Sequence, residues 1–143
     1  MRVTFVVLSF FLTLPASAHP HAPDNEARLQ EACSANSQAG MRDCLAKHAA
    51  DSQRILSNAE KKAMHAIAGW DEDEKYVRSA QARLTDSTQA FERYRAAQCA
   101  LSGSLGGGAV GNALELRRLS CVAAANEMRI EQLRHLTESL PRR

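Results

Sequence analysis

The sequence predicts an all-α fold: an antiparallel three-helix bundle with a short N-terminal helix, stapled by two disulfides. Apolar residues recur at steps of three and four along three long stretches, and no stretch shows the alternation of a β-strand. Four cysteines lie near the turns between these stretches. The charges are nearly balanced, with 18 Lys and Arg against 16 Asp and Glu, and basic residues do not cluster with aromatic ones. This composition argues against nucleic-acid binding.

Residues 1–18 have the composition of a signal peptide. Arg2 supplies a positive start, residues 3–14 form an apolar run, and residues 16–18 (Ala-Ser-Ala) fit a cleavage site of small residues. The apolar run is shorter than the roughly 20 residues of a membrane-spanning helix. We therefore expect a periplasmic or secreted protein, cleaved near Ala18, with no membrane span in the mature chain.

Residues 19–23 are expected to form a flexible tail in front of a helical domain that spans residues 24–140. His19 and His21 lie in this tail, and a free amine with a nearby histidine can capture copper or nickel. The residue between them is proline, which lacks the backbone N–H that such a chelate requires. We predict no metal site; a weak metal carrier that uses these histidines and His48 remains an alternative.

The first two helices follow from a cap signal and an apolar period. Asp24 can cap a short helix that runs to about Cys33, and residues 34–40 form a turn. A long helix is expected from about residue 41 to Gly69. The expected packed face of this helix consists of Met41, Leu45, His48, Ile55, Ala59, Ala63, Ala66 and Trp70.

The third helix is expected to begin at the acidic run 71–74 and to continue to about Leu101. Negative side chains stabilise the first turn of a helix, and Asp71 with Glu74 resembles a capping box. An acidic knob that engages a basic partner is the alternative interpretation of this run. The expected packed face consists of Val77, Ala80, Leu84, Phe91, Tyr94 and Leu101.

The last helix is expected from about Asn112 to Ser139. A short glycine-rich turn precedes it, so it should lie antiparallel to the third helix. Asn126 is expected to hydrogen-bond across the bundle and to fix its register. The expected seam consists of Leu116, Leu119, Ala123, Asn126, Ile130, Leu133, Thr137 and Leu140.

Four cysteines allow three pairings. Cys33 and Cys44 flank the first turn, and Cys99 and Cys121 flank the glycine hairpin, so we predict the two local disulfides. Each would stabilise the fold by about 2–4 kcal/mol. A zinc site is the rival interpretation, but no pair has the C-x-x-C spacing, and exported thiols are usually oxidised.

Motifs of catalysis and cofactor binding fail on their context. Gly106, Gly108 and Gly111 match G-x-G-x-x-G, but the dinucleotide fingerprint follows a strand, and here a helix is expected before it. No serine lies in a nucleophile elbow, and no acid, base and nucleophile converge. We therefore predict that the protein is not an enzyme and uses no cofactor.

Several motifs together resemble the N-terminal domain of the LprI-like lysozyme inhibitors. The most specific series is Tyr94-Arg95, then Cys99, the Gly106-Gly107 turn and Cys121. The resemblance covers about residues 33–136 and also includes Cys44, Leu56, Arg129 and Leu133. The chain departs from the family pattern at Ala49, Ser57, Phe91, Ala96 and Asn126, and it lacks the cysteine that lipoprotein members carry at the cleavage site.

The resemblance implies an exported helical binding protein that inhibits lysozyme. Lysozymes act through two carboxylates in a cleft, so an inhibitor can block the cleft with a hairpin loop. The candidate loops, residues 70–74 and 102–111, are expected at opposite ends of the bundle. The alternative is a structural or interaction module of the envelope without lysozyme activity.

The candidate partner-binding residues are Trp70, Asp71, Glu72, Asp73, Glu74, Tyr94, Arg95, Gly106 and Gly107. For Tyr94 and Arg95 we favour a structural role. Tyr94 is expected to pack on the seam, and Arg95 is expected to bond the carbonyls at a helix end. A binding edge presented near the hairpin is the alternative, because arginine is common at interface hot spots.

Overall fold

The computed structural model describes residues 22–108 and 112–142, so the expected signal peptide and the histidines of the expected tail lie outside the described residues. The described residues form four helices: α1 (Ala22–Cys33), α2 (Gln38–Ala68), α3 (Glu74–Ser104) and α4 (Ala113–Glu138). Apart from an isolated bridge between Trp70 and Arg142, they contain no β structure. The predicted all-α class is confirmed.

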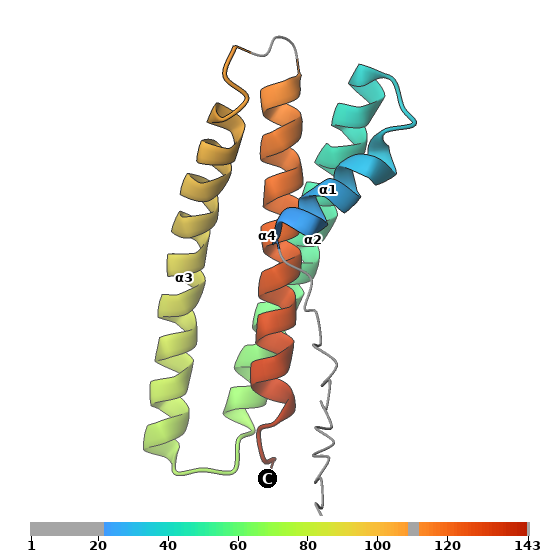
Figure 1. Ribbon diagram of the computed structural model, residues 1–143. Helices are drawn as coiled ribbons and strands as arrows, with labels where there is room; N and C mark the ends of the chain where they lie inside the picture. The colour runs from blue at the N-terminus through green and yellow to red at the C-terminus, as the bar shows by residue number, and fades with distance from the viewer. Residues whose placement is uncertain (1–21, 109–111, 143) are drawn as a thin grey trace, which may run out of the picture.

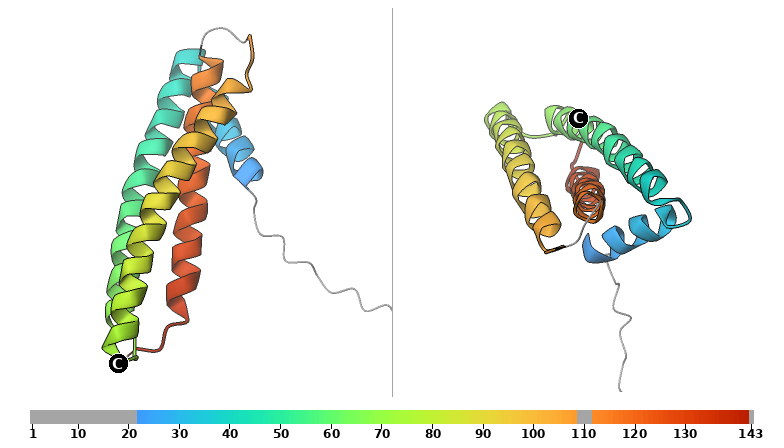
Figure 2. Two further views of the ribbon diagram at one scale, coloured as in Figure 1. Left: turned by 90° about the vertical axis from the view of Figure 1, so that its left-hand side faces the viewer. Right: turned by 90° about the horizontal axis from the view of Figure 1, so that it is seen from above.

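α4 is the central helix of the molecule. It packs against each of the other three helices, whereas α1 and α3 do not contact each other. The α1–α2 turn and the α3–α4 hairpin lie at one end of the molecule, and the α2–α3 turn and the end of the chain lie at the other (Figure 1). Seen along its axis, α4 is surrounded by α1, α2 and α3 (Figure 2). No helix within the described ranges is long and apolar enough to cross a bilayer.

Both predicted disulfides are present. Cys33 and Cys44 are joined, with 5.8 Å between their Cα atoms, and this N-terminal disulfide ties α1 to α2. Cys99 and Cys121 are joined, with 5.5 Å between their Cα atoms, and this hairpin disulfide ties α3 to α4. The local pairing predicted from the spacing is confirmed.

The helix starts differ from the predicted ones because local caps, rather than the apolar period, set them. α2 begins three residues early, since Ser37 is its N-cap and the Ser37 Oγ accepts from the Gly40 N–H at 3.2 Å. α1 begins at Ala22, so Asp24 lies in its first turn and does not cap it. The N-cap of α3 is Asp73, without a side-chain cap bond, so the capping box expected at Asp71 is wrong.

The core is thin and has two parts. The larger cluster lies where α1, α2 and α4 meet and contains Leu29, Cys33, Leu45, Ala49, Leu119, Ala123 and Ala124. The smaller cluster contains Leu56, Ala63 and Leu133, with Leu84, Phe91 and Ile130 packed against it. Buried polar residues separate the two along α2 and α4, namely Ser52 and Asn126. The predicted seam of α4 is confirmed, since all eight of its residues are buried or half-buried.

Four residues predicted on packed faces lie exposed at the surface. Ile55, Leu101 and Tyr94 are 46%, 53% and 61% exposed, and His48 is not buried either. In α2 the buried positions include the small residues Ala49 and Ser52, which let this helix approach α4 closely. α3 buries only Val77, Cys99 and Gly103, because it packs mainly against α4 and less against α2.

Candidate functional site

The loop between α2 and α3 and the first residue of α3 carry four consecutive carboxylates, Asp71, Glu72, Asp73 and Glu74, here called the acidic tip. All four residues are exposed. The backbone of the loop is held in place by the end of the chain, because the Asp71 N–H donates to the Pro141 carbonyl at 3.0 Å. Glu74 pairs with Arg78 at 2.5 Å. The acidic tip is therefore a fixed, negatively charged projection at one end of the bundle.

The glycine hairpin at the opposite end is apolar. Gly107 has φ +58°, a left-handed conformation that favours glycine, and a Cβ on Gly106 would overlap the Leu114 Cδ2 methyl. Leu101 and Leu105 are 53% and 71% exposed beside this turn. The expected location of the two loops at opposite ends agrees with the structure (Figure 1).

The structure corrects both structural roles predicted for the Tyr94-Arg95 pair. Tyr94 is exposed and does not pack on the seam. The Arg95 Nη1 donates to the side-chain oxygens of Gln53 and Asn126 and not to helix-end carbonyls. Its guanidinium carbon lies 5.5 Å from the centroid of the Phe91 ring. Arg95 is thus an internal bond donor in the middle of the bundle.

Asn126 forms the predicted hydrogen bonds across the bundle and connects α2, α3 and α4. It is fully buried, and its Nδ2 donates to the Ser52 Oγ at 3.0 Å while its Oδ1 accepts from Arg95. The Ser52 hydroxyl in turn donates to the Ala49 carbonyl at 2.9 Å. We call Ser52, Gln53, Arg95 and Asn126 the polar layer.

Arg129 lies one turn beyond Asn126 on α4, and the sequence analysis did not single it out as a site residue. Only 8% of its surface is exposed. Its Nη2 donates to the Ser87 Oγ at 2.8 Å, its guanidinium lies 5.6 Å from the Phe91 centroid, and its Nε has no hydrogen-bond partner. Neither Arg95 nor Arg129 forms an ion pair with a described carboxylate. Arg129 is part of the motif series that resembles the LprI-like family, and this was the signal in the sequence that could have marked it.

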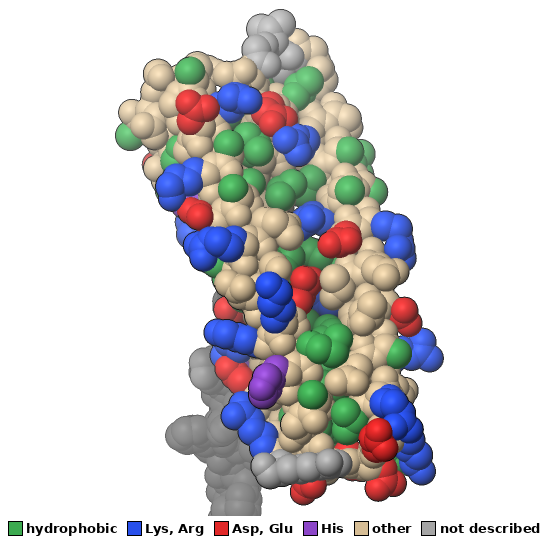
Figure 3. Space-filling model, turned by 180° about the vertical axis from the view of Figure 1, so that it is seen from behind, with side chains coloured by type: hydrophobic (Ala, Val, Ile, Leu, Met, Phe, Trp, Pro, Cys, Tyr) green, Lys and Arg blue, Asp and Glu red, His purple; other side chains and the backbone are tan. Residues whose placement is uncertain are grey.

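Two of the clefts on the surface formed by the described residues lie between helices. One, of about 460 Å³, lies between α2 and α3, and the residues that line it include Glu60, Lys61 and Glu92. The other, of about 350 Å³, lies between the end of α2, the first half of α3 and the second half of α4, and we call it the Arg129 cleft. Figure 3 shows apolar side chains running between charged margins on the face seen from behind.

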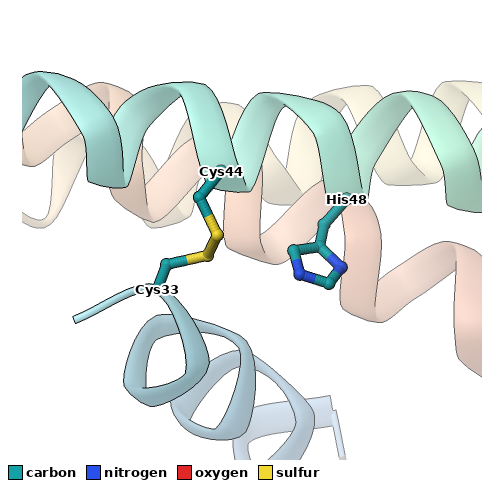
Figure 4. A group of neighbouring side chains, drawn as sticks. All are labelled: Cys33, Cys44 and His48. Atoms are coloured by element: carbon teal, nitrogen blue, oxygen red, sulfur yellow. A yellow bond between two sulfur atoms is a disulfide. The ribbon is translucent and has the colours of Figure 1, made fainter. Parts of the chain in front are cut away.

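Cys33, Cys44 and His48 form the one group of potential metal ligands found among the described residues (Figure 4). Their ligand atoms lie within 4.8 Å of one another. Both sulfur atoms are used in the N-terminal disulfide, so the oxidised group offers a single imidazole. The other two histidines of the alternative metal carrier, His19 and His21, lie outside the described residues.

Three carboxyl groups of the described residues have shifted pKa values, and none belongs to the acidic tip or to the Arg129 cleft. Burial raises the pKa of Glu26, and the nearby Arg117 opposes this shift in part. The hydrogen bond and charge of Lys47 lower the pKa of Asp51, and the hydrogen bond from Arg118 lowers the pKa of Glu115. These shifts follow from local packing and helix-surface pairs.

Comparison with known proteins gives one family. The family described as lysozyme inhibitor LprI matches residues 30–133, which is most of the chain. The matched segment contains all four cysteines, the acidic tip, the polar layer and Arg129. No curated protein and no solved structure matches the chain.

Proposed function

The chain belongs to the lysozyme inhibitor LprI family, and from this membership we propose that it is an exported helical protein that binds and inhibits a lysozyme. The family match is the observation that carries the proposal. The family consists of inhibitors, which supports a role for this protein in binding and not in catalysis. Export by a signal peptide cleaved near Ala18 is part of the same proposal, and the two disulfides support an oxidising location.

We assign the contact with the enzyme to the acidic tip. Many lysozymes are basic, and opposite charge on two partners accelerates their association and orients them. The tip projects from one end of the bundle, where a narrow loop can enter a cleft. Its backbone bond to Pro141 keeps the loop in one conformation, so less conformational entropy is lost on binding.

The glycine hairpin is the second candidate contact. Leu101 and Leu105 give it exposed apolar surface, which can add affinity but offers no charge that complements a basic enzyme. The acidic tip is therefore the first surface to test. Tyr94, exposed on α3, lies outside both loops and has no part in the proposed contact.

The test is a lysis assay on a peptidoglycan suspension, with a basic lysozyme and the disulfide-bonded protein at stoichiometric amounts. The wild type should slow the clearing of the suspension. A variant with all four carboxylates of the acidic tip changed to amides should inhibit at least tenfold less strongly. The inhibition by the wild type should weaken as salt is raised, because salt screens exposed charges.

The matched control carries the same change in net charge at four exposed sites away from the tip: Asp43→Asn, Asp86→Asn, Glu92→Gln and Glu131→Gln. It should inhibit like the wild type. Equal inhibition by the tip variant would move the contact to another surface. Undiminished lysis with several lysozymes would remove the inhibitor proposal and leave the envelope interaction module, which a pull-down from envelope extract would then address.

A further inference from the structure

The Arg129 cleft is built differently from the acidic tip. Its walls are mostly apolar and include Ile67, Trp70, Leu84, Leu133 and Leu140. The charged residues that line it are two arginines, and no carboxylate lines it. An apolar pocket with a few polar groups at one place is the usual form of a small-molecule site. The charge of this one selects for an anion.

Arg129 is a buried charge in the cleft that lacks a counter-ion among the described residues. Only 8% of its surface is exposed. Its hydrogen-bond partner among the described residues is the neutral Ser87 hydroxyl. The Phe91 ring lies over the guanidinium, and the Nε has no partner. A buried charge without a counter-ion destabilises a fold by several kcal/mol, so a bound anion would relieve a penalty that already exists.

We propose that the Arg129 cleft binds a single-chain fatty carboxylate, with the carboxylate on Arg129 and the alkyl chain along the apolar walls. The Nε and Nη2 of an arginine lie on one edge of the guanidinium, which matches the two oxygens of a carboxylate. The Ser87 hydroxyl accepts from Nη2, and its own proton is available to a carboxylate oxygen. Two-point binding requires the guanidinium to rotate, because the Nε is covered in this structure.

The size and the mouth of the cleft fit this ligand. Its volume of about 350 Å³ is at the small end for ligand pockets, which suits one alkyl chain and not a two-chain lipid. Arg83 lines the cleft, its side chain is 84% exposed, and Asp86 is its ion partner at 3.9 Å. This exposed cation lies where it can attract an incoming carboxylate.

Trp70 provides the assay, because it is the only tryptophan in the chain and it lines the cleft. Bromine quenches indole fluorescence only at near contact. Titration of the disulfide-bonded protein with 11-bromoundecanoate, kept below its micellar concentration, should give saturable quenching that unlabelled dodecanoate reverses. The matching alcohol, 11-bromoundecanol, has the same chain without the charge and should bind at least tenfold more weakly.

The variant Arg129→Gln should weaken carboxylate binding at least tenfold, since it removes a charge-assisted hydrogen bond. Arg93→Gln removes an exposed arginine of α3 outside the cleft and should bind like the wild type. Ser87→Ala, at an exposed position, should bind the carboxylate several-fold more weakly. This variant tests the proposed site if Arg129→Gln does not fold.

Three results would overturn the inference: no saturable quenching, equal affinity for the acid and the alcohol, or unchanged affinity in the folded Arg129→Gln or Ser87→Ala variant. The inference goes beyond lysozyme inhibition and does not rest on it. The fluorescence titration measures ligand binding in the cleft, and the lysis assay measures inhibition of the enzyme. Either proposal can therefore fail while the other holds.

Discussion

Asn126→Ala should lower the free energy of unfolding by about 3 kcal/mol, a large part of the 5–15 kcal/mol that is usual for a domain. The side chain is fully buried, and its amide accepts from Arg95 and donates to Ser52. A hydrogen bond to a charged group contributes about 1.5–3 kcal/mol, and a neutral one contributes about 1 kcal/mol. Ser52 keeps its bond to the Ala49 carbonyl, and Arg95 keeps Gln53, so the loss should not exceed this sum.

The measurement is urea unfolding of the disulfide-bonded protein, followed by far-UV circular dichroism. Asn58→Ala is the matched control, because Asn58 is exposed on α2 and the same change there should cost at most about 0.5 kcal/mol. A double-mutant cycle with Arg95→Met isolates the bond between Arg95 and Asn126 and should give a coupling of about 1.5 kcal/mol.

A loss below about 1 kcal/mol for Asn126→Ala, at an unchanged denaturant slope, would refute this reasoning. A coupling near zero would refute it as well, because Arg95 would then not depend on the Asn126 oxygen. In either case the three long helices would be held by their small-residue contacts and disulfides, and the polar layer would be incidental to stability.

Three further predictions concern the turns and one carboxyl group. Replacing both cysteines of the hairpin disulfide by alanine should cost about 3.4 kcal/mol in urea unfolding, against about 2.8 kcal/mol for the N-terminal disulfide, since their sequence separations are 22 and 11. Gly107→Ala should cost about 1 kcal/mol because of its φ of +58°, whereas Gly108→Ala, with nothing near its Cβ and no positive φ, should cost much less; equal urea midpoints would contradict this. The pKa of Glu26 is raised in the folded state from its ordinary value of 4.5. Its contribution to the free energy of unfolding is therefore fully present below pH 4.5 and is lost as the pH rises through the raised pKa. Glu26→Gln should therefore be more stable than the wild type at pH 7 and should lose this part of the pH dependence in a series of urea midpoints.

The features that were predictable from the sequence are those that short-range spacing determines. Cysteines on either side of a short turn can pair only if the flanking helices fold back, and both local disulfides follow from this. The seam of α4 was predictable because three other helices pack against this helix, so the residues that follow its apolar period are all covered.

The faces of α2 and α3 were less predictable, because a period gives the direction of an apolar stripe but not the width of the contact that covers it. α3 contacts α4 along a narrow strip, so Tyr94 and Leu101 lie at the surface although they follow the period. Ser52 is buried in α2 while Ile55 is exposed, because position on the face toward α4, and not hydrophobicity, decides burial at these two residues.

Arg129 was not predictable as a buried residue, because arginine is almost always exposed unless it is paired. The pattern of the chain contains no acid placed to pair with it, and only the three-dimensional packing shows that Ser87 and Phe91 enclose it. The same holds for the acidic tip, where the bond between Asp71 and Pro141 joins segments far apart in the sequence. Residues whose role depends on such distant partners are the ones that a single sequence leaves open.

The two disulfides restrain one end of the bundle covalently and not the other. Both disulfides lie toward the end that holds the α1–α2 turn and the glycine hairpin (Figure 1). The end with the acidic tip and the Arg129 cleft is held by the smaller core cluster and the bridge between Trp70 and Arg142. No disulfide of the described residues joins α3 to α4 at this end, and the polar layer lies between the two ends. Both proposed sites lie at the end of the bundle where the described residues form no disulfide.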